Sequence, residues 1–204
     1  MLRFAIFASG RGSNALKLLE AFDSGFIPAI PALLLSNMPQ AAVLQTPHPI
    51  TKIVVPHQGL TRQAHEQQVL QHLAAHNIDH ILLAGYTRIL SAEFLQAFKG
   101  RVLNIHPALL PDFPGLHAAE RQWQAGAKIA GATVHFVDAG VDTGPTLLQG
   151  SLEVRGDEGE AGLAQRILSE VEHVIYRRAV RLFVDRLKHQ KNLPSVSLGS
   201  GVQS

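Results

Sequence analysis

The sequence predicts an α/β fold, an open, mainly parallel twisted sheet with flanking helices. Three observations favour this fold. Short apolar runs rich in Ile, Val and Leu alternate with longer segments of helical period. A glycine-rich turn follows the first of these runs directly and opens the first helical segment. The 204 residues are 46% hydrophobic and 17% charged, which is ordinary globular composition and enough for a core without staples.

The first half of the chain supplies most of the expected sheet. Helical periodicity predicts helices over 13–22, 62–76 and 92–98. Three prolines within 38–49 leave room only for a short helix there. The strand-like runs lie at 3–8, 30–36, 51–55, 80–84 and 102–105.

The texture changes after residue 105, where prolines break any regular element and predict a wall or lid loop. A helix is expected over 117–124. Two further strand-like runs, 131–137 and 146–154, are expected to extend the sheet in antiparallel orientation after residue 130. The prolines of the loop are Pro107, Pro111 and Pro114.

A long closing helix is expected near the carboxyl end. Asp157 and Glu160 form a capping signature at its start. We expect a single domain over 1–188 and a flexible tail over 189–204, where Ser, Gly and Gln dominate. The apolar stripe of the helix consists of Leu163, Ile167, Val171, Val174, Ile175, Leu182 and Phe183.

Composition and charge argue against several classes of protein. Cysteine is absent, which rules out a Cys nucleophile, a Cys zinc site and disulfides. The formal net charge is only +2, without a basic tail or stripe, so nucleic acid is not an expected partner. The apolar run at the start is too short for a signal peptide, and no stretch reaches the length of a membrane span. A cytoplasmic protein without membrane contact is therefore expected.

The first candidate site is the turn at residues 9–14, Ser-Gly-Arg-Gly-Ser-Asn. Its backbone N–H groups at the start of a helix suit an anion. Together with Ala15, the turn also matches the G-x-G-x-x-A fingerprint of dinucleotide-binding proteins. That kind of site, however, needs an acidic residue about 20 positions further along the chain to bind the ribose hydroxyls. No Asp or Glu occurs between Asp23 and Glu66. A phosphate site of mononucleotide size is favoured, and a tight packing turn is the alternative.

The second candidate site is Asn104 and His106 at the end of a predicted strand. Period two places both side chains on one face, at the sheet edge where α/β proteins bind ligands. An amide donor and an imidazole there could stabilise an oxyanion and move a proton. A packed, hydrogen-bonded histidine is an equally common reading of such a position.

Asp142 could deliver a carboxylate to His106, which would raise the pKa of the imidazole and fix its tautomer. The alternative is that Asp142 only bonds its own Thr-Gly-Pro turn. A metal site is not expected, because His65, His72 and His76 lack a zinc motif and suit a solvated helix face.

Several motifs, in this order along the chain, resemble the folate-dependent glycinamide ribonucleotide transformylases. An N-x-H-P-x-L-L-P run with a downstream D-x-G is shared by formyltransferases generally. The short length and the Glu-His-x-Ile-Tyr helix look like the glycinamide ribonucleotide branch. The matching stretches are 7–14, 83–90, 103–111, 114–116, 135–137, 142–145 and 172–176.

The resemblance implies a Rossmann-like formyltransferase fold. It also implies direct transfer of a formyl group, through a tetrahedral intermediate, from the co-substrate 10-formyltetrahydrofolate to the amine of glycinamide ribonucleotide in purine biosynthesis. No metal is implied, only small-molecule partners are expected, and the chain would be a monomer or a homodimer. By similarity, Asn104, His106 and Asp142 match the catalytic residues. The substrate-binding residues would be Gly12, Ser13, Asn14 and Glu172. The folate-binding residues would be Arg88, Ile89, Leu90, Asn104, Val137, Asp138 and Asp142.

Two departures from the family pattern stand near these sites. Arg11 occupies a position where many relatives carry Asn, and its charge is expected to tighten phosphate binding. Thr87 replaces a bulkier apolar residue, so a roomier folate pocket is expected.

Two other functions compete with formyl transfer. A formyltetrahydrofolate deformylase would send the formyl group to water and usually carries an additional amino-terminal domain, whereas this chain begins at its first predicted strand. A nucleotide-binding sensor would be expected to have lost one of Asn104, His106 and Asp142, and all three are present.

Overall fold

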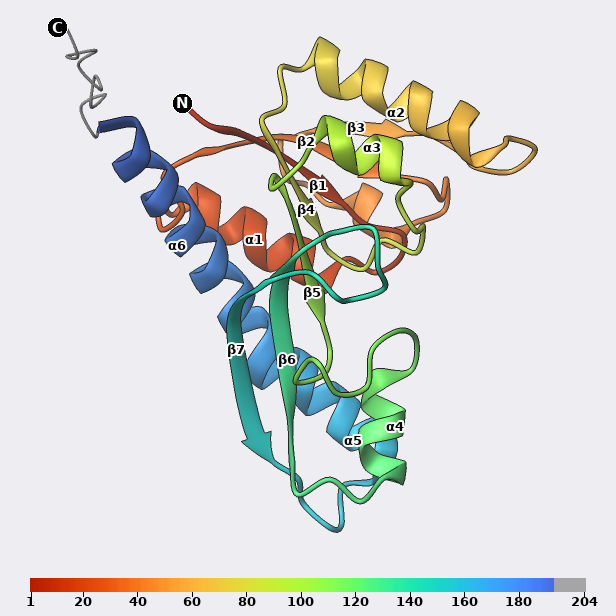
Figure 1. Cartoon of the computed structure of the whole chain (residues 1–204), viewed down its shortest axis with the longest axis vertical. Coiled ribbons are helices and arrows are strands. Elements are labelled where there is room, and N and C mark those ends of the chain that lie inside the picture. Colours follow the sequence, from red (N-terminus) through yellow and green to blue (C-terminus); the bar gives the residue numbers. More distant parts are fainter. Residues whose placement is uncertain (193–204) are drawn as a thin grey trace, which may run out of the picture.

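The computed structural model describes residues 1–192 and has a seven-stranded sheet at its centre (Figure 1). The strand order is β3-β2-β1-β4-β5-β6-β7. β1 to β5 pair in parallel, β6 is antiparallel to β5, and β7 is antiparallel to β6. This confirms the expected mixed sheet. The strands are β1 (Arg3–Phe7), β2 (Ile30–Ser36), β3 (Thr51–Val54), β4 (His80–Leu83), β5 (Val102–His106), β6 (Ile129–Phe136) and β7 (Thr146–Glu153).

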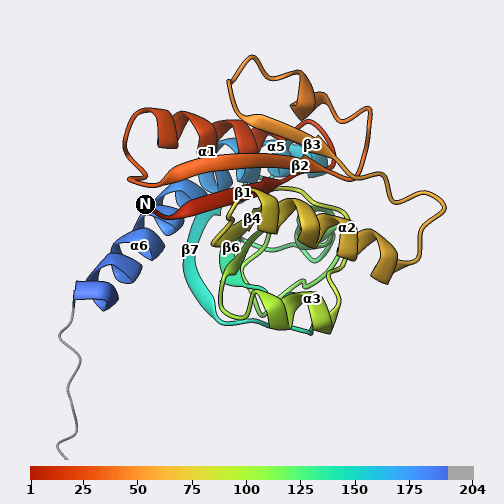
Figure 2. The same cartoon turned by 90° about the horizontal axis from the view of Figure 1, so that it is seen from above.

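Helices cover both faces of the sheet, with α1 on one side and α2 and α3 on the other (Figure 2). Alternation along β1 explains the two layers, since Phe4 and Ile6 join the core beneath α1 and α6, whereas Ala5 and Phe7 join the core beneath α2 and α3. The helices are α1 (Ser13–Asp23), α2 (Arg62–Ala75), α3 (Ala92–Ala97), α4 (Ala118–Gln124), α5 (Gly159–Arg166) and α6 (His173–Asn192).

The strand order reverses at β1, and in open α/β sheets ligands bind beyond the carboxyl ends of the strands at such a point. β1 continues through α1 to β2 on one side, while β4 pairs with β1 on the other side. The loops after β1 and β4 therefore leave the sheet in different directions at its carboxyl edge. The loops that carry the predicted site residues lie at this edge.

The proline-containing segment after β2 forms one short 3-10 helix, η1 (Ala42–Gln45), as expected. The Val43 N–H donates to the carbonyl of Gly10 at 3.1 Å. This contact attaches η1 to the turn that follows β1.

The carboxyl-terminal helical run differs from the expectation in two respects. The capping prediction is wrong, because α5 takes Glu158 rather than Asp157 as its N-cap, and no side-chain oxygen caps that end. Glu158 instead bonds the Arg155 N–H and pairs with Arg166. Between α5 and α6 the helix widens into a π-helix, η2 (Ile167–Glu172).

Burial along the closing helix departs from the expected apolar stripe. Leu182, expected in the apolar stripe, is 37% exposed. Glu172, by contrast, is buried. The helix extends to Asn192, four residues past the expected domain end, and residues 193–204 of the predicted tail lie outside the described part of the chain.

Tyr176 connects α6 to the middle of the sheet. Its hydroxyl lies 2.9 Å from the Leu83 carbonyl and 3.3 Å from the Leu103 carbonyl, so it contacts both β4 and β5. The side chain is 1% exposed. Among the described residues, none of the helices has the length and apolarity needed to span a membrane.

Candidate active site

The antiparallel pairing of β5 with β6 places three polar side chains together. Asn104 stands directly opposite His135, and its amide Nδ2 lies 3.2 Å from His135 Nε2. His106, the last residue of β5, is 5% exposed. Because Asn104 and His106 are two residues apart on a strand, both face the same side of the sheet, as the sequence predicted.

Asp142 reaches this pair from the loop between β6 and β7. Its Oδ2 lies 3.3 Å from His106 Nδ1, and its Oδ1 lies 3.5 Å from His135 Nε2. The Gly115 N–H donates to Oδ2 at 2.8 Å. The structure therefore brings together the three residues that the sequence grouped from separate segments, and it adds His135.

The loop that delivers Asp142 depends on glycine and on a second aspartate. A Cβ at Gly144 would stand 1.8 Å from the Phe136 carbonyl oxygen, so only glycine fits there. Asp142 itself has a positive φ of 56°. Asp138 is the aspartate that ties the turn, through the Gly140 N–H and the Thr143 hydroxyl. The reading that Asp142 only bonds its own turn is thus wrong.

Both ring nitrogens of His106 face acceptors. Nε2 lies 2.9 Å from the Phe113 carbonyl, which can only accept, so Nε2 carries a proton. Nδ1 faces the Asp142 carboxylate, another acceptor. Burial lowers the pKa of His106, and the Phe113 carbonyl and the Asp142 carboxylate oppose this by favouring the imidazolium. The ring is thus held where a second proton would satisfy both neighbours.

Asp142 remains ionised across the physiological range. His135, the Gly115 N–H and His106 stabilise the carboxylate against the cost of its burial and lower its pKa to about 2. A permanent negative charge therefore lies beside the His106 ring.

His135 is the site residue to which sequence reasoning assigned no role. Its Nδ1 faces the Phe136 carbonyl at 3.0 Å and carries a proton. When neutral, its Nε2 accepts from Asn104, and when protonated it donates to Asp142. The available signal was the antiparallel pairing, since a register that sets Asn104 opposite His135 makes these side chains neighbours.

The turn after β1 has the properties of an anion site. Gly12 precedes α1 with a φ of 69°, and a Cβ there would stand 2.3 Å from Val43 Cγ2. Glycine is required on both grounds. No side chain caps the amino end of α1, so its first N–H groups, beginning with Ser13, stay available to a ligand.

Asn14 and Glu172 meet beside this turn. Asn14 Nδ2 donates to Glu172 Oε2 at 2.5 Å, and both residues are 8% exposed. Burial raises the pKa of Glu172, and the bond from Asn14 partly opposes this. Asn14 Oδ1 is buried without a hydrogen-bond partner. An unsatisfied buried acceptor next to a buried carboxylate suits a ligand that brings hydroxyl groups.

The segment predicted to hold folate lies on two loops of the same edge. Ile89 is 64% exposed and Arg88 is half-buried, whereas Leu90 lies in the core beneath α2 and α3. Val137 packs against that core and bonds the Val102 carbonyl through its N–H, and Asp138 is exposed. Only the backbone of Leu90 and Val137 is therefore available to a ligand.

Exposed apolar side chains are present on loops around the site. Besides Ile89, they include Val141 and Leu116, which are 53% and 85% exposed. A Cβ on Gly115 would touch Val141 Cγ1 at 4.0 Å, which places the two loops together. The loops that carry Leu116 and Val141 therefore present exposed apolar side chains beside Gly115, whose N–H bonds Asp142.

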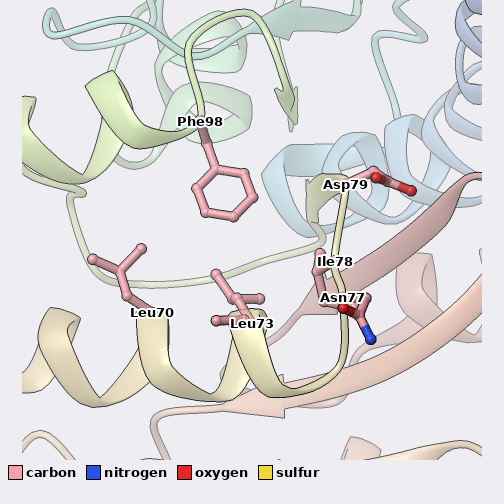
Figure 3. A pocket seen from close by; sticks show the side chains of 7 residues that line it. Leu70, Leu73, Asn77, Ile78, Asp79 and Phe98 are labelled. Carbon is pink, nitrogen blue, oxygen red and sulfur yellow. The ribbon is translucent and has the colours of Figure 1, made fainter.

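Two cavities lie away from the catalytic cluster, between α2 and α3. One, of about 510 Å³, lies near the amino end of β4, where Phe98 points toward Leu70 and Leu73 (Figure 3). The other, of about 550 Å³, lies between the amino ends of the two helices and includes Arg62, Glu66 and Ser91. Neither includes a predicted site residue. Within residues 1–192 no group of three His, Cys, Asp or Glu side chains could hold a metal ion.

Sequence comparison agrees with this geometry. Residues 2–180 match the formyl transferase family, and the chain belongs to that family. It is 38% identical over 184 residues to the phosphoribosylglycinamide formyltransferase of Bacillus subtilis. That match covers 89% of this chain and 94% of the relative. It is 40% identical over 188 residues to the trifunctional purine biosynthetic protein adenosine-3 of Drosophila melanogaster. That match covers 90% of this chain but only 14% of the fly protein.

Structural comparison points the same way. The crystal structure of glycinamide ribonucleotide transformylase 1 from Symbiobacterium toebii superposes with a TM-score of 0.88 at 38% identity. The match covers 91% of this chain and 89% of that one. The predicted α/β formyltransferase fold is thereby confirmed.

Proposed function

We propose that this protein transfers the formyl group of 10-formyltetrahydrofolate to the amine of glycinamide ribonucleotide. The observation that carries the proposal is the convergence of Asn104, His106 and Asp142 at the sheet edge that also carries an anion-binding turn. The family and the named relatives support the same reaction.

The nucleotide would be held at the end of α1. The phosphate of the nucleotide would accept hydrogen bonds from the backbone N–H groups of Gly12, Ser13 and Asn14, assisted by the helix dipole. The ribose hydroxyls would donate to the Glu172 carboxylate and to the unpartnered Asn14 Oδ1. The hydroxyl that donates to Glu172 would offset the cost that burial imposes on its charge.

The residues of the β5–β6 ladder would act on the reacting centre. Asn104 has two N–H protons, and His135 takes one, which leaves the other for an oxygen that gains negative charge. Protonated His106 would add positive charge beside it. Asp142 would stabilise that imidazolium and assist transfer of the proton from the attacking nitrogen to the departing folate nitrogen as the bond between that nitrogen and the formyl carbon breaks.

The folate co-substrate supplies the formyl group and a nitrogen leaving group. The backbone of residues 88–90 and 137–142, with the apolar side chains of Ile89 and Val141, would hold its ring. These residues fit a planar heterocycle, because they combine exposed apolar surface with backbone groups at the ends of two strands.

A single assay separates the proposed reaction from its competitors. Purified protein would be mixed with glycinamide ribonucleotide and 10-formyltetrahydrofolate, and both formylated amine and free formate would be followed. Formylated ribonucleotide in amounts equal to the tetrahydrofolate released supports the proposal. Formate released at the same rate without the amine would identify a hydrolase, and tight binding of both ligands without either product would identify a sensor.

A further inference from the structure

Ser9 lies where three strand ends meet, outside the catalytic cluster. It follows β1 and is the first residue of the turn at 9–14, the proposed anion site. Its N–H donates to the Gly85 carbonyl at 3.0 Å, in the segment that follows β4. Its hydroxyl donates to Asn37 Oδ1 at 2.6 Å, beyond the end of β2. Ser9 is 9% exposed and Asn37 is fully buried.

Thr87 completes the bonding of that hydroxyl. The Thr87 N–H donates to Ser9 Oγ at 2.9 Å, and the Thr87 hydroxyl lies 3.2 Å from the same oxygen. A serine hydroxyl has one proton and two lone pairs. Since the proton goes to Asn37, both lone pairs are filled by Thr87, and Ser9 has no capacity left for a ligand.

The two segments that Ser9 joins serve different substrates in the proposed reaction. One segment is the turn at residues 9–14, the proposed phosphate site. The other runs from Gly85 through Thr87 to residues 88–90, which are proposed to hold the folate. Each would lose mobility when its own ligand binds. Because shared hydrogen bonds connect them, ordering of one segment lowers the entropy cost of ordering the other.

We propose that Ser9, with the Thr87 hydroxyl, is a positioning residue that couples the nucleotide and folate subsites, so that each substrate increases the affinity for the other. This inference rests on the proposed function. Asn37 extends the link further, since its Nδ2 lies 3.2 Å from His57 Nδ1 beyond the end of β3. Four neighbouring strand ends are thereby joined through side chains.

The test measures coupling without turnover. Tetrahydrofolate, which carries no formyl group, would be titrated calorimetrically into the protein with and without saturating glycinamide ribonucleotide. We expect the wild-type protein to bind tetrahydrofolate at least about fivefold more tightly when the ribonucleotide is present. The affinity for the ribonucleotide must rise by the same factor when tetrahydrofolate is bound, because coupling of binding is reciprocal.

Three variants locate the coupling. Ser9→Ala should reduce the factor to about one, Thr87→Val should reduce it in part, and Thr87→Ser, which keeps the hydroxyl, should leave it unchanged. If Ser9 had a purely structural role, its loss would weaken the binding of both ligands but leave the coupling factor, the ratio of tetrahydrofolate affinities with and without the ribonucleotide, unchanged. If Ser9→Ala fails to fold, Thr87→Val decides the matter, because Thr87 is exposed and its loss leaves the backbone bonds in place.

The outcomes that oppose the inference are distinct from those that oppose the function. A wild-type protein that binds both ligands independently, or a Thr87→Val variant with full coupling, overturns the role of this pair and leaves formyl transfer intact. A wild-type protein that binds neither ligand overturns the proposed function, and the coupling with it.

Discussion

Asn14 and Glu172 lie 158 residues apart in the chain and share a 2.5 Å hydrogen bond between the amide Nδ2 and the carboxylate Oε2. The bond joins α1 to the end of the π-helical turn. Burial makes the carboxylate costly in the free protein. Burial of this carboxylate therefore lowers the stability of the protein at neutral pH, and that cost can be measured.

Glu172→Gln is expected to raise thermal stability at neutral pH while weakening nucleotide binding. The raised pKa means that the acid form stabilises the fold below the ordinary pKa, and that this stability is lost as pH rises through the folded value. We expect the Tm at pH 7 to rise by about 2–4 °C for each kcal/mol regained. We also expect the KM for the ribonucleotide to rise at least about tenfold, with kcat less affected. A variant with unchanged Tm and unchanged KM would contradict both roles.

Asn104→Ala should reduce kcat by about 10²-fold to 10³-fold, because one donor to the developing oxyanion is lost. Substrate KM values should change little, since the phosphate turn and Glu172 remain intact. Steady-state kinetics on protein with a wild-type melting curve would test this. Turnover near the wild-type rate would show that Asn104 is not the donor.

The titration of His106 should respond in opposite directions to its two neighbours. Asp142→Asn removes a charge that favours the imidazolium, so the pKa of His106 should fall further below its usual value. His135→Gln removes a group that opposes the imidazolium, so the same pKa should rise. Imidazole NMR shifts measured from pH 4 to 9 would report both changes. Equal shifts in the same direction would exclude this electrostatic arrangement.

Gly12→Ala should be more destructive than Gly25→Ala. Both positions have positive φ, 69° and 73°, so both variants carry the same backbone strain. Only at Gly12 does the new Cβ meet a side chain, 2.3 Å from Val43 Cγ2, whereas at Gly25 no heavy atom lies within 4 Å. We expect Gly12→Ala to lose at least about 1 kcal/mol more in free energy of unfolding, together with affinity for inorganic phosphate. Urea unfolding and phosphate titration of the pair would measure the difference.

Local sequence patterns predicted the parts of the molecule that depend on local geometry. Strand periodicity was enough to place Asn104 and His106 on one face, because side chains alternate strictly along a strand. The three prolines near η1 correctly limited that segment to a single short turn. The resemblance to a known family supported Asp142, which the Thr-Gly-Pro turn had already brought forward as a partner for His106, and it added Glu172, whose role no periodicity could supply.

The remaining features depend on relationships across the chain. The pairing of Asn104 with His135 requires the register of β5 against β6, which a single sequence does not specify. Leu182 shares a helix face with the buried Ile175, seven residues earlier in α6, yet it is 37% exposed, because helical period does not say how far neighbouring elements cover that face. The helix α5 begins after Glu158 without a side-chain cap, and Glu158 pairs with Arg166 eight residues later, a contact that the local signature at Asp157 did not indicate.

The hydroxyl of Tyr176 restricts the position of the closing helix relative to the sheet. It anchors the helix that carries Glu172 to the carbonyls of Leu83 and Leu103, one residue before Asn104. Any axial slip of the helix would have to break those contacts first. Tyr176 thereby helps to fix the position of Glu172, four residues before it in the chain, relative to the residue that follows Leu103 in β5.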